Sequence, residues 1–114
     1  MYKIVIPGRP VPKGRPRFSK TGHAYTPERT RQYEELVGWK AREAVKQPLE
    51  GNIALYIRVY VKRNVYPDID NIAKSCMDGM NGVAYKDDKQ VSYLTIQRLK
   101  GNEEKVEIEI EEVS

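Results

Sequence analysis

All five aspartates of the chain stand in one short segment. Residues 66–91, YPDIDNIAKSCMDGMNGVAYKDDKQV, contain every aspartate, and the other eleven acidic residues are glutamates. Asp68 and Asp70 are two residues apart where an extended segment enters a predicted helix. In extended backbone both side chains face the same way, about 6–7 Å apart. Magnesium prefers oxygen ligands and is usually held by one or two short carboxylates plus substrate phosphate. The spacing therefore favours a site for a hard divalent cation.

Each of these residues also has a structural interpretation. Asp68 or Asp70 could cap the helix, and Lys74, four residues after Asp70, could form an ordinary surface pair with it. Asp78 falls on the exposed helix face, where a solvated side chain is expected, and residues 87–88 could form a polar turn. A cap needs only one carboxylate, however, whereas here two acidic pairs flank one short helix of an otherwise cationic protein.

Other catalytic classes have few residues to draw on. His23 is the only histidine and Cys76 the only cysteine, so histidine-based triads and zinc sites are not favoured. The aspartate segment has Ile72 and Ala73 where a calcium loop of the D-x-[DN]-x-[DN]-G type needs a polar residue and glycine. The glycines near the N-terminus do not follow the phosphate-loop pattern.

The charge of the chain is unevenly distributed. The net charge is +4, but residues 103–112 carry −5, so residues 1–102 carry +9. Residues 1–27 contain six lysines and arginines and no acid. This segment includes PGRPVPKGRPRFSK, whose prolines predict an extended loop that displays its cations. A polyanion, most simply nucleic acid, is the expected partner.

The elements that must position these residues give an α+β order. Strands are predicted at 2–6 and 52–62, and two more at 91–99 and 104–113, joined by Gly101-Asn102 as a hairpin. In the last strand, apolar and acidic residues alternate strictly. One helix is predicted from Pro27, with Thr26 as its N-cap, to Pro48, and another over about 70–80. The fold class is therefore a small single α+β domain, residues 1–114, with a mixed or antiparallel sheet packed against two helices.

The size and composition indicate the number of domains and the cellular compartment. A chain of 114 residues suits one domain with a modest core, which dimerisation would help to stabilise. The longest apolar run is too short to span a membrane and carries Arg58. We expect a cytoplasmic protein, and the single cysteine agrees with a reducing compartment.

Two motifs resemble a known family. PDIDNIAKSCMDGMNG followed by KDDKQV resembles the signature of the RusA family of Holliday junction resolvases. The segment IPGRPVPKGRPRFSKTGHAYTPERTRQYEE is similar to the N-terminal half of phage and prophage members, so the resemblance covers nearly the whole chain.

The resemblance implies a homodimeric, magnesium-dependent endonuclease that nicks four-way DNA junctions symmetrically in recombination and repair. By motif, Asp68, Asp70 and Asp88 match the catalytic, metal-binding carboxylates, and Lys74 matches a lysine needed for cleavage. Asp87 and Asn71 are expected in supporting roles, and manganese is expected to replace magnesium. Five cations are expected to bind DNA phosphates: Lys13, Arg15, Arg17, Arg29 and Arg31.

Two other functions stay open from the residues. The chain could be a basic nucleic-acid-binding module without catalytic activity, whose aspartates are caps and turn residues. It could also be a metal-dependent nuclease that acts on other branched DNA or on RNA.

Overall fold

Alternating apolar side chains form one face of a four-stranded sheet. The computed structural model describes residues 1–14, 17–62 and 66–113. Its main strands are β1 (Tyr2–Pro7), β4 (Asn52–Val61), β5 (Val91–Lys100) and β6 (Lys105–Val113). Alternate residues along much of β1, β4 and β6 are buried toward the helices: Ile4, Ile6, Ile53, Leu55, Ile57, Val59, Val61, Val106, Ile108 and Ile110. These side chains form the core, as the period of two predicts.

The strand order differs from the predicted hairpin. The order is β1-β6-β4-β5, with β6 antiparallel to both its neighbours and β5 parallel to β4. The predicted pairing of the last two strands is therefore wrong, because β4 lies between them. The strict alternation of β6 suits a central position, where one face is buried and the other can be neutralised by neighbours. Strand β5 leaves Tyr93 and Leu94 exposed and takes the edge.

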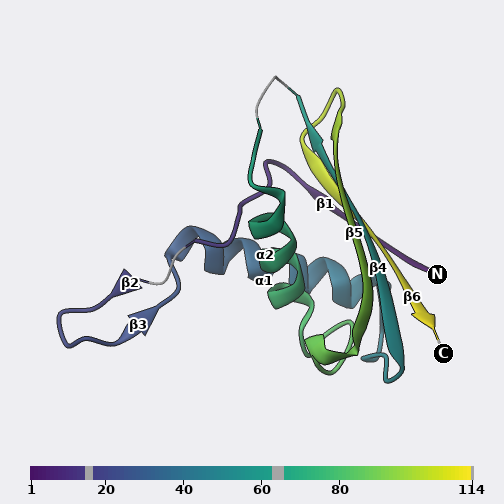
Figure 1. Ribbon diagram of the computed structural model, residues 1–114, viewed down its shortest axis with the longest axis horizontal. Helices are drawn as coiled ribbons and strands as arrows, with labels where there is room; N and C mark the ends of the chain where they lie inside the picture. The colour runs from purple at the N-terminus through teal and green to yellow at the C-terminus, as the bar shows by residue number, and fades with distance from the viewer. Residues whose placement is uncertain (15–16, 63–65, 114) are drawn as a thin grey trace.

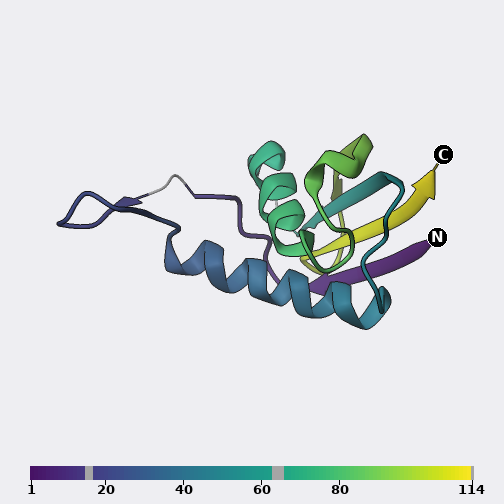
Figure 2. The same cartoon turned by 90° about the horizontal axis from the view of Figure 1, so that it is seen from below.

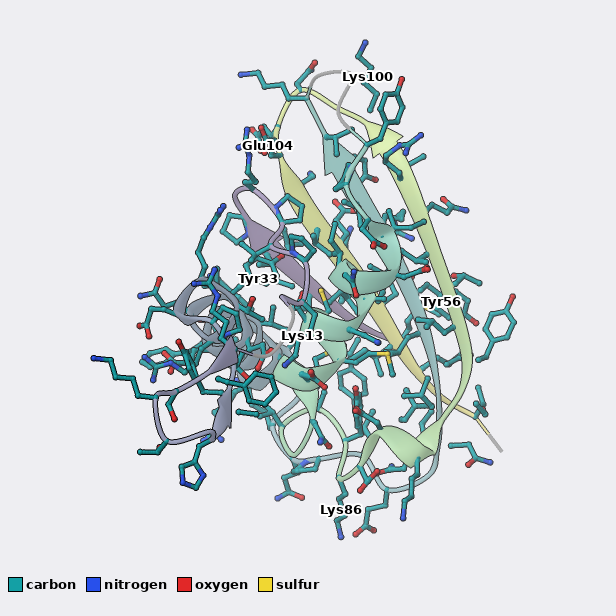
Figure 3. All side chains as sticks on the ribbon, turned by 60° about the vertical axis from the view of Figure 1, so that its left-hand side comes forward. Lys13, Tyr33, Tyr56, Lys86, Lys100 and Glu104 are labelled. Carbon is teal, nitrogen blue, oxygen red and sulfur yellow. The ribbon has the colours of Figure 1, made fainter. Side chains whose placement is uncertain are left out.

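Three glutamates of β6 contact polar side chains of β4. On the outer face of the sheet, the Arg58 guanidinium contacts the Glu107 carboxylate at 3.3 Å and also pairs with Glu109. The Tyr56 hydroxyl donates to Glu111 at 3.3 Å, and Figure 3 shows Tyr56 on the side of the sheet away from the helices. The acidic last strand is therefore an internal part of the sheet.

Both helices cover the same face of this sheet. Helix α1 (Glu28–Ala44) and helix α2 (Ile69–Met80) lie together on one side of it in Figures 1 and 2, which confirms the α+β class with a mixed sheet. Pro27, rather than Thr26, occupies the N-cap of α1, and no side chain among the described residues caps that end, so the predicted cap is wrong. Trp39, on α1, is not part of the core, because it is 75% exposed.

The two helices touch backbone to backbone. A methyl group placed on Gly79 would lie 2.7 Å from the Glu34 carbonyl oxygen and 2.8 Å from Cβ of Val37. A methyl group on Gly38 would lie 3.0 Å from the Gly79 carbonyl oxygen. Two glycines at one crossing therefore set how closely α2 approaches α1. In the described part of the chain, neither helix is long and apolar enough to cross a membrane.

Candidate active site

The first aspartate pair lies at the start of α2. Asp68 is the N-cap, and its carboxylate accepts hydrogen bonds from the Asn71 backbone N–H at 3.4 Å and from the Asn71 side-chain amide at 2.7 Å. Asp70 is exposed in the first turn, where the helix dipole favours a negative charge. The capping interpretation is thus correct for Asp68, and Asn71 holds that carboxylate in place.

The second aspartate pair begins a short 3₁₀ helix, η1 (Asp88–Gln90). Asp87 caps it by accepting from the Lys89 N–H at 2.9 Å, while its own N–H donates to the Gln90 side chain at 2.9 Å. The Gln90 amide in turn donates to the carbonyl oxygens of Leu49 and Gly51, at 2.8 and 2.9 Å. This network fastens η1 to the loop before β4.

Asp88 differs from its neighbour in its surroundings. It is half-buried, and within the described ranges its Oδ1 atom is one of two buried side-chain polar atoms without a hydrogen-bond partner. Burial raises the pKa of Asp88, the nearby Tyr85 hydroxyl partly offsets this rise, and the charges of Asp78 and Asp87 add to it. The ionised carboxylate is therefore poorly compensated in the isolated chain, and a cation would stabilise it.

One cleft brings Asp88 beside α2. The cleft has a volume of about 640 Å³. Its walls come from the segment before the first short strand, from α2 and from η1: Lys13, Gly14, Asn71, Lys74, Met77, Asp78 and Asp88. Four of the predicted site residues, Lys13, Asn71, Lys74 and Asp88, therefore share one cavity, although they come from three separate parts of the sequence.

The N-terminal segment is tied along α2. The Ser75 hydroxyl donates to the Val11 carbonyl oxygen at 2.8 Å, and the Lys13 backbone N–H donates to the Asn71 carbonyl oxygen at 2.8 Å. The Lys13 ammonium lies 2.7 Å from the Glu34 carboxylate and 2.9 Å from that of Asp78, and Figure 3 shows it between the two helices. The expectation that the cations of this segment are displayed is therefore wrong for Lys13.

The ion pairs of Lys13 keep its ammonium group protonated. Although burial lowers its pKa, the hydrogen bonds to Glu34 and Asp78 more than offset that effect, so the pKa of Lys13 is raised. Lys13 thus neutralises two carboxylates beside the cleft and links the N-terminal segment to both helices. Its side chain is 25% exposed.

The other predicted phosphate-binding cations lie on the surface. Arg17 is exposed on a short strand, and Arg29 is exposed in the first turn of α1. Arg31 is exposed too, but its guanidinium pairs with the Glu28 carboxylate at 2.6 Å. Arg15 lies outside the described residues.

The three predicted metal-binding carboxylates do not form one cluster. Among the residues that the structure describes, no three Asp, Glu, His or Cys side chains lie close enough together to hold an ion. Asp70 and Asp78 are two helical turns apart, which is about 12 Å along the axis of α2. Asp88 lies in the cleft with Asp78 and is therefore distant from Asp70. The donors are nevertheless of the kind that magnesium prefers, since Asp68, Asp70 and Asp88 all offer carboxylate oxygens and one Asp88 oxygen lacks a donor.

Sequence reasoning missed the position of Asp78. Its exposure is as expected, but it also lines the cleft and forms the ion pair with Lys13. Asp70, Lys74 and Asp78 follow one another at intervals of four residues, so they lie along one helix face. That spacing was the available indication that Asp78 accompanies Lys74.

A larger cavity lies elsewhere. It has a volume of about 770 Å³ and is bounded by α1 and the end of α2, beside Trp39, Arg42 and Gly79. Of the predicted site residues that the structure describes, it includes only Arg31. The smaller cleft is the better candidate because its walls carry the unsatisfied carboxylate and the cations next to it.

Comparison with known proteins agrees with the motifs. The family model of endodeoxyribonuclease RusA matches residues 7–111, a range that includes the cleft and both aspartate pairs. The chain is also similar to an uncharacterised protein of Bacillus subtilis (strain 168), YqaN. The two are 28% identical over 137 aligned positions, which cover 98% of this chain and 96% of the relative.

Proposed function

The chain belongs to the RusA family of endodeoxyribonucleases, and from that premise we propose that it is a magnesium-dependent enzyme that resolves four-way DNA junctions. Membership of this family indicates a Holliday junction-resolving endonuclease. In our proposal it makes paired, symmetric nicks during recombination and repair, and manganese can replace magnesium. The observation that best supports a cation here is the half-buried Asp88 carboxylate, which has an oxygen without a donor in a cleft shared with Lys74.

In this proposal Asp68, Asp70 and Asp88 hold the metal. When bound, the ion supplies Lewis acidity and positive charge to the scissile phosphate. Asn71 fixes the Asp68 carboxylate through the 2.7 Å amide hydrogen bond, so that this ligand is oriented in advance. Lys74 is exposed on the same helix, one turn after Asp70, and offers its ammonium to the negative charge that develops on the phosphate.

Lys13 has a different part in this proposal from the one its sequence position predicted. Its ion pairs with Glu34 and Asp78 reduce the negative charge beside the cleft, which would otherwise repel DNA. The phosphates that flank the cut are left to the exposed cations Arg17, Arg29 and Arg31.

A homodimer would complete the ligand set. Strand β5 begins directly after η1, is one of the two edge strands of the main sheet, and exposes Tyr93 and Leu94. In Figure 1 it runs in the opposite direction to α2. If two copies pair their β5 strands about a two-fold axis, Asp88 of the second copy moves toward the start of α2, where Asp68 and Asp70 lie. Such a dimer also provides the two sites that symmetric nicking requires.

Cleavage of a labelled mobile four-way junction in magnesium tests the proposal. Wild-type protein is expected to give nicks at symmetric positions in two strands of like polarity. Asp70→Asn is expected to lower the rate by at least about 100-fold while junction binding stays equal or becomes tighter, because a negative group near phosphate has been neutralised. Glu35→Gln, which removes an exposed carboxylate from α1, is the matched control and should cut normally.

The same assay separates the other functions. A basic binding module without catalytic activity would cut no substrate in magnesium or manganese. A nuclease with another target would cut a flap, a linear duplex or an RNA substrate faster than the junction. An Asp70→Asn protein that cuts at the wild-type rate would contradict the ligand assignment.

A further inference from the structure

A narrow hairpin projects from the body of the protein. Its strands, β2 (Arg17–Phe18) and β3 (Ala24–Tyr25), pair antiparallel, and the tip is closed by the Ser19 N–H donating to the His23 carbonyl oxygen at 2.8 Å. Gly22, with φ +86°, provides the left-handed position in that tip. Figures 1 and 2 show this hairpin extending away from both helices and from the main sheet. We call residues 17–25 the arm.

The arm carries aromatic side chains that no core covers. Phe18, the only phenylalanine, is 71% exposed, and Tyr25 is 49% exposed. Neither ring belongs to the hydrophobic core. A two-stranded hairpin alone is marginally stable in water, and exposed apolar rings add nothing to its stability. These rings are therefore placed for contact with another molecule.

The register divides the arm into two faces. Arg17 lies opposite Tyr25, and Phe18 lies opposite Ala24. Because side chains alternate across a strand, the guanidinium and the tyrosine share one face, and Phe18 and Ala24 share the other. One face is thus suited to a phosphate, and the other to a flat apolar surface.

Charge indicates which partner the arm contacts. Residues 1–27 contain no acidic residue, and the arm itself carries Arg17 and Lys20. Glu107 and Glu109 of β6 are already paired with Arg58 of β4 and with Lys105, so these two carboxylates offer a basic arm of a second copy little uncompensated charge. A polyanion with accessible flat rings, which is nucleic acid with exposed bases, matches both faces of the arm.

We propose that the arm enters the branch point of a four-way junction and that Phe18 stacks on a base there. This inference builds on the proposed function, because it names how the same enzyme distinguishes branched from linear DNA. Inside a duplex each base is covered above and below by its neighbours, whereas the base pairs that flank a branch point can expose one face. Phosphate contacts position a protein without this distinction. Arg17 and Lys20 bind the phosphates on either side.

The test measures binding without metal, so that cleavage plays no part. A four-way junction carries 2-aminopurine next to the branch point, and its fluorescence is recorded in EDTA as protein is added. Wild-type protein should raise the fluorescence, because the analogue loses the base stacked on it across the branch point and Phe18, a weaker quencher, takes that place. Phe18→Ala should abolish that rise and weaken junction binding about tenfold, with duplex binding unchanged, whereas Phe18→Tyr should restore both.

Trp39→Ala is the matched control. Trp39 is as exposed as Phe18, 75% against 71%, but lies on α1, so its loss should leave the fluorescence unchanged. The inference is overturned if wild-type protein gives no fluorescence change, or if Phe18→Ala weakens duplex and junction binding equally. It is also overturned if Phe18→Ala converts a dimer to a monomer in gel filtration, since the arm would then contact a second copy.

Failure of the proposed function has a different signature. Wild-type protein that shows the Phe18-dependent fluorescence rise but never cuts a junction in magnesium would refute the nuclease and leave the arm contact standing.

Discussion

The Lys13 ammonium lies 2.9 Å from the Asp78 carboxylate, and the same ammonium lies 2.7 Å from Glu34. One cation from the N-terminal segment therefore neutralises an acid on each of the two helices. Without it, Glu34 and Asp78 would face each other across the place where α1 and α2 approach most closely. This arrangement gives Lys13 a structural role at the edge of the candidate active site.

Replacing Lys13 should therefore destabilise the protein. In Lys13→Met the aliphatic part of the side chain is kept and the charge is lost, so two carboxylates are left to repel each other. The free energy of unfolding, measured in urea, should fall by about 1 kcal/mol, the upper range for partly exposed ion pairs. Added salt should reduce the loss by screening that repulsion.

Arg17 and Lys20 offer contrasting controls for this prediction. Lys20→Met, on the exposed arm, should leave the unfolding free energy unchanged. Arg17→Ala should reduce the slope of log binding constant against log salt concentration for junction DNA by about one, since one phosphate contact is lost. If Lys13→Met reduced that slope equally and left stability unchanged, Lys13 would be a phosphate ligand and the structural role would be wrong.

Asp87 and Asp88 are neighbours whose removal should have opposite effects on stability. Asp87→Ala deletes the cap of η1 and should lower the unfolding free energy by about 1 kcal/mol. Asp88→Ala deletes a half-buried carboxylate with an unpartnered oxygen and, in EDTA at pH 7, should raise it by about 1 kcal/mol.

The pH dependence of the unfolding free energy tests why Asp88→Ala should stabilise the protein. Because burial raises the Asp88 pKa, the folded state holds this proton more tightly than the unfolded state. Stability from this group is then greatest below the unfolded pKa, about 3.9, and is lost as pH rises through the folded value. The gain from Asp88→Ala should therefore be present at pH 7 and absent at pH 3. An equal gain at both would mean that the carboxylate charge is not responsible.

The sequence predicted the elements of the fold better than their arrangement. Alternation of apolar residues located β1, β4 and β6, and helical spacing located α1 and α2 within one or two residues at most ends. The partner of β5 was not predictable in this way, because a hydrophobic pattern tells which residues face the core and not which strand lies alongside. The turn pair Gly101-Asn102 suggested a hairpin, but the Arg58 contacts with Glu107 and Glu109 require β4 beside β6.

In the candidate site, too, the residues were predictable from the sequence and their arrangement was not. The aspartates, Lys74 and the cationic N-terminus were all evident from residue types and motif spacing. The ion pairs of Lys13 were not, because they depend on how α1 crosses α2, and this crossing is set by glycine contacts. The separation of Asp70 from Asp88 likewise follows from the direction of α2, which motif spacing does not encode.

The helix crossing itself can be tested at Gly79. In an exposed helix, Gly→Ala stabilises by up to about 1 kcal/mol. Here the added methyl group would meet backbone and Val37 at less than 3.0 Å, so Gly79→Ala should instead lower the unfolding free energy by about 2 kcal/mol. Lys74→Ala, at an exposed position of the same helix, should change it by less than about 0.5 kcal/mol. A stabilised Gly79→Ala protein would show that the helices do not pack this closely.

The alkylation rate of Cys76 measures how often α2 separates from the core. Its side chain is fully buried, and burial raises the pKa of the thiol to about 12. Since the thiolate is the reactive form, alkylation by iodoacetamide at pH 8 should occur only through opening of the structure. The rate, followed by mass spectrometry, should be roughly 10³-fold slower than in urea.

A cysteine on the arm supplies the reference rate for that experiment. Ser19 is exposed at the arm tip, so Ser19→Cys should be alkylated in native buffer about as fast as in urea, while Cys76 in the same molecule stays unmodified. The free energy of unfolding of the wild-type protein should also fall as pH rises above about 8.5, the pKa of the Cys76 thiol in the unfolded state, because only the unfolded state releases the thiol proton there. Fast alkylation of Cys76 in native buffer would mean that α2 leaves the sheet readily, and the cleft beside Lys74 would then not be a preformed site.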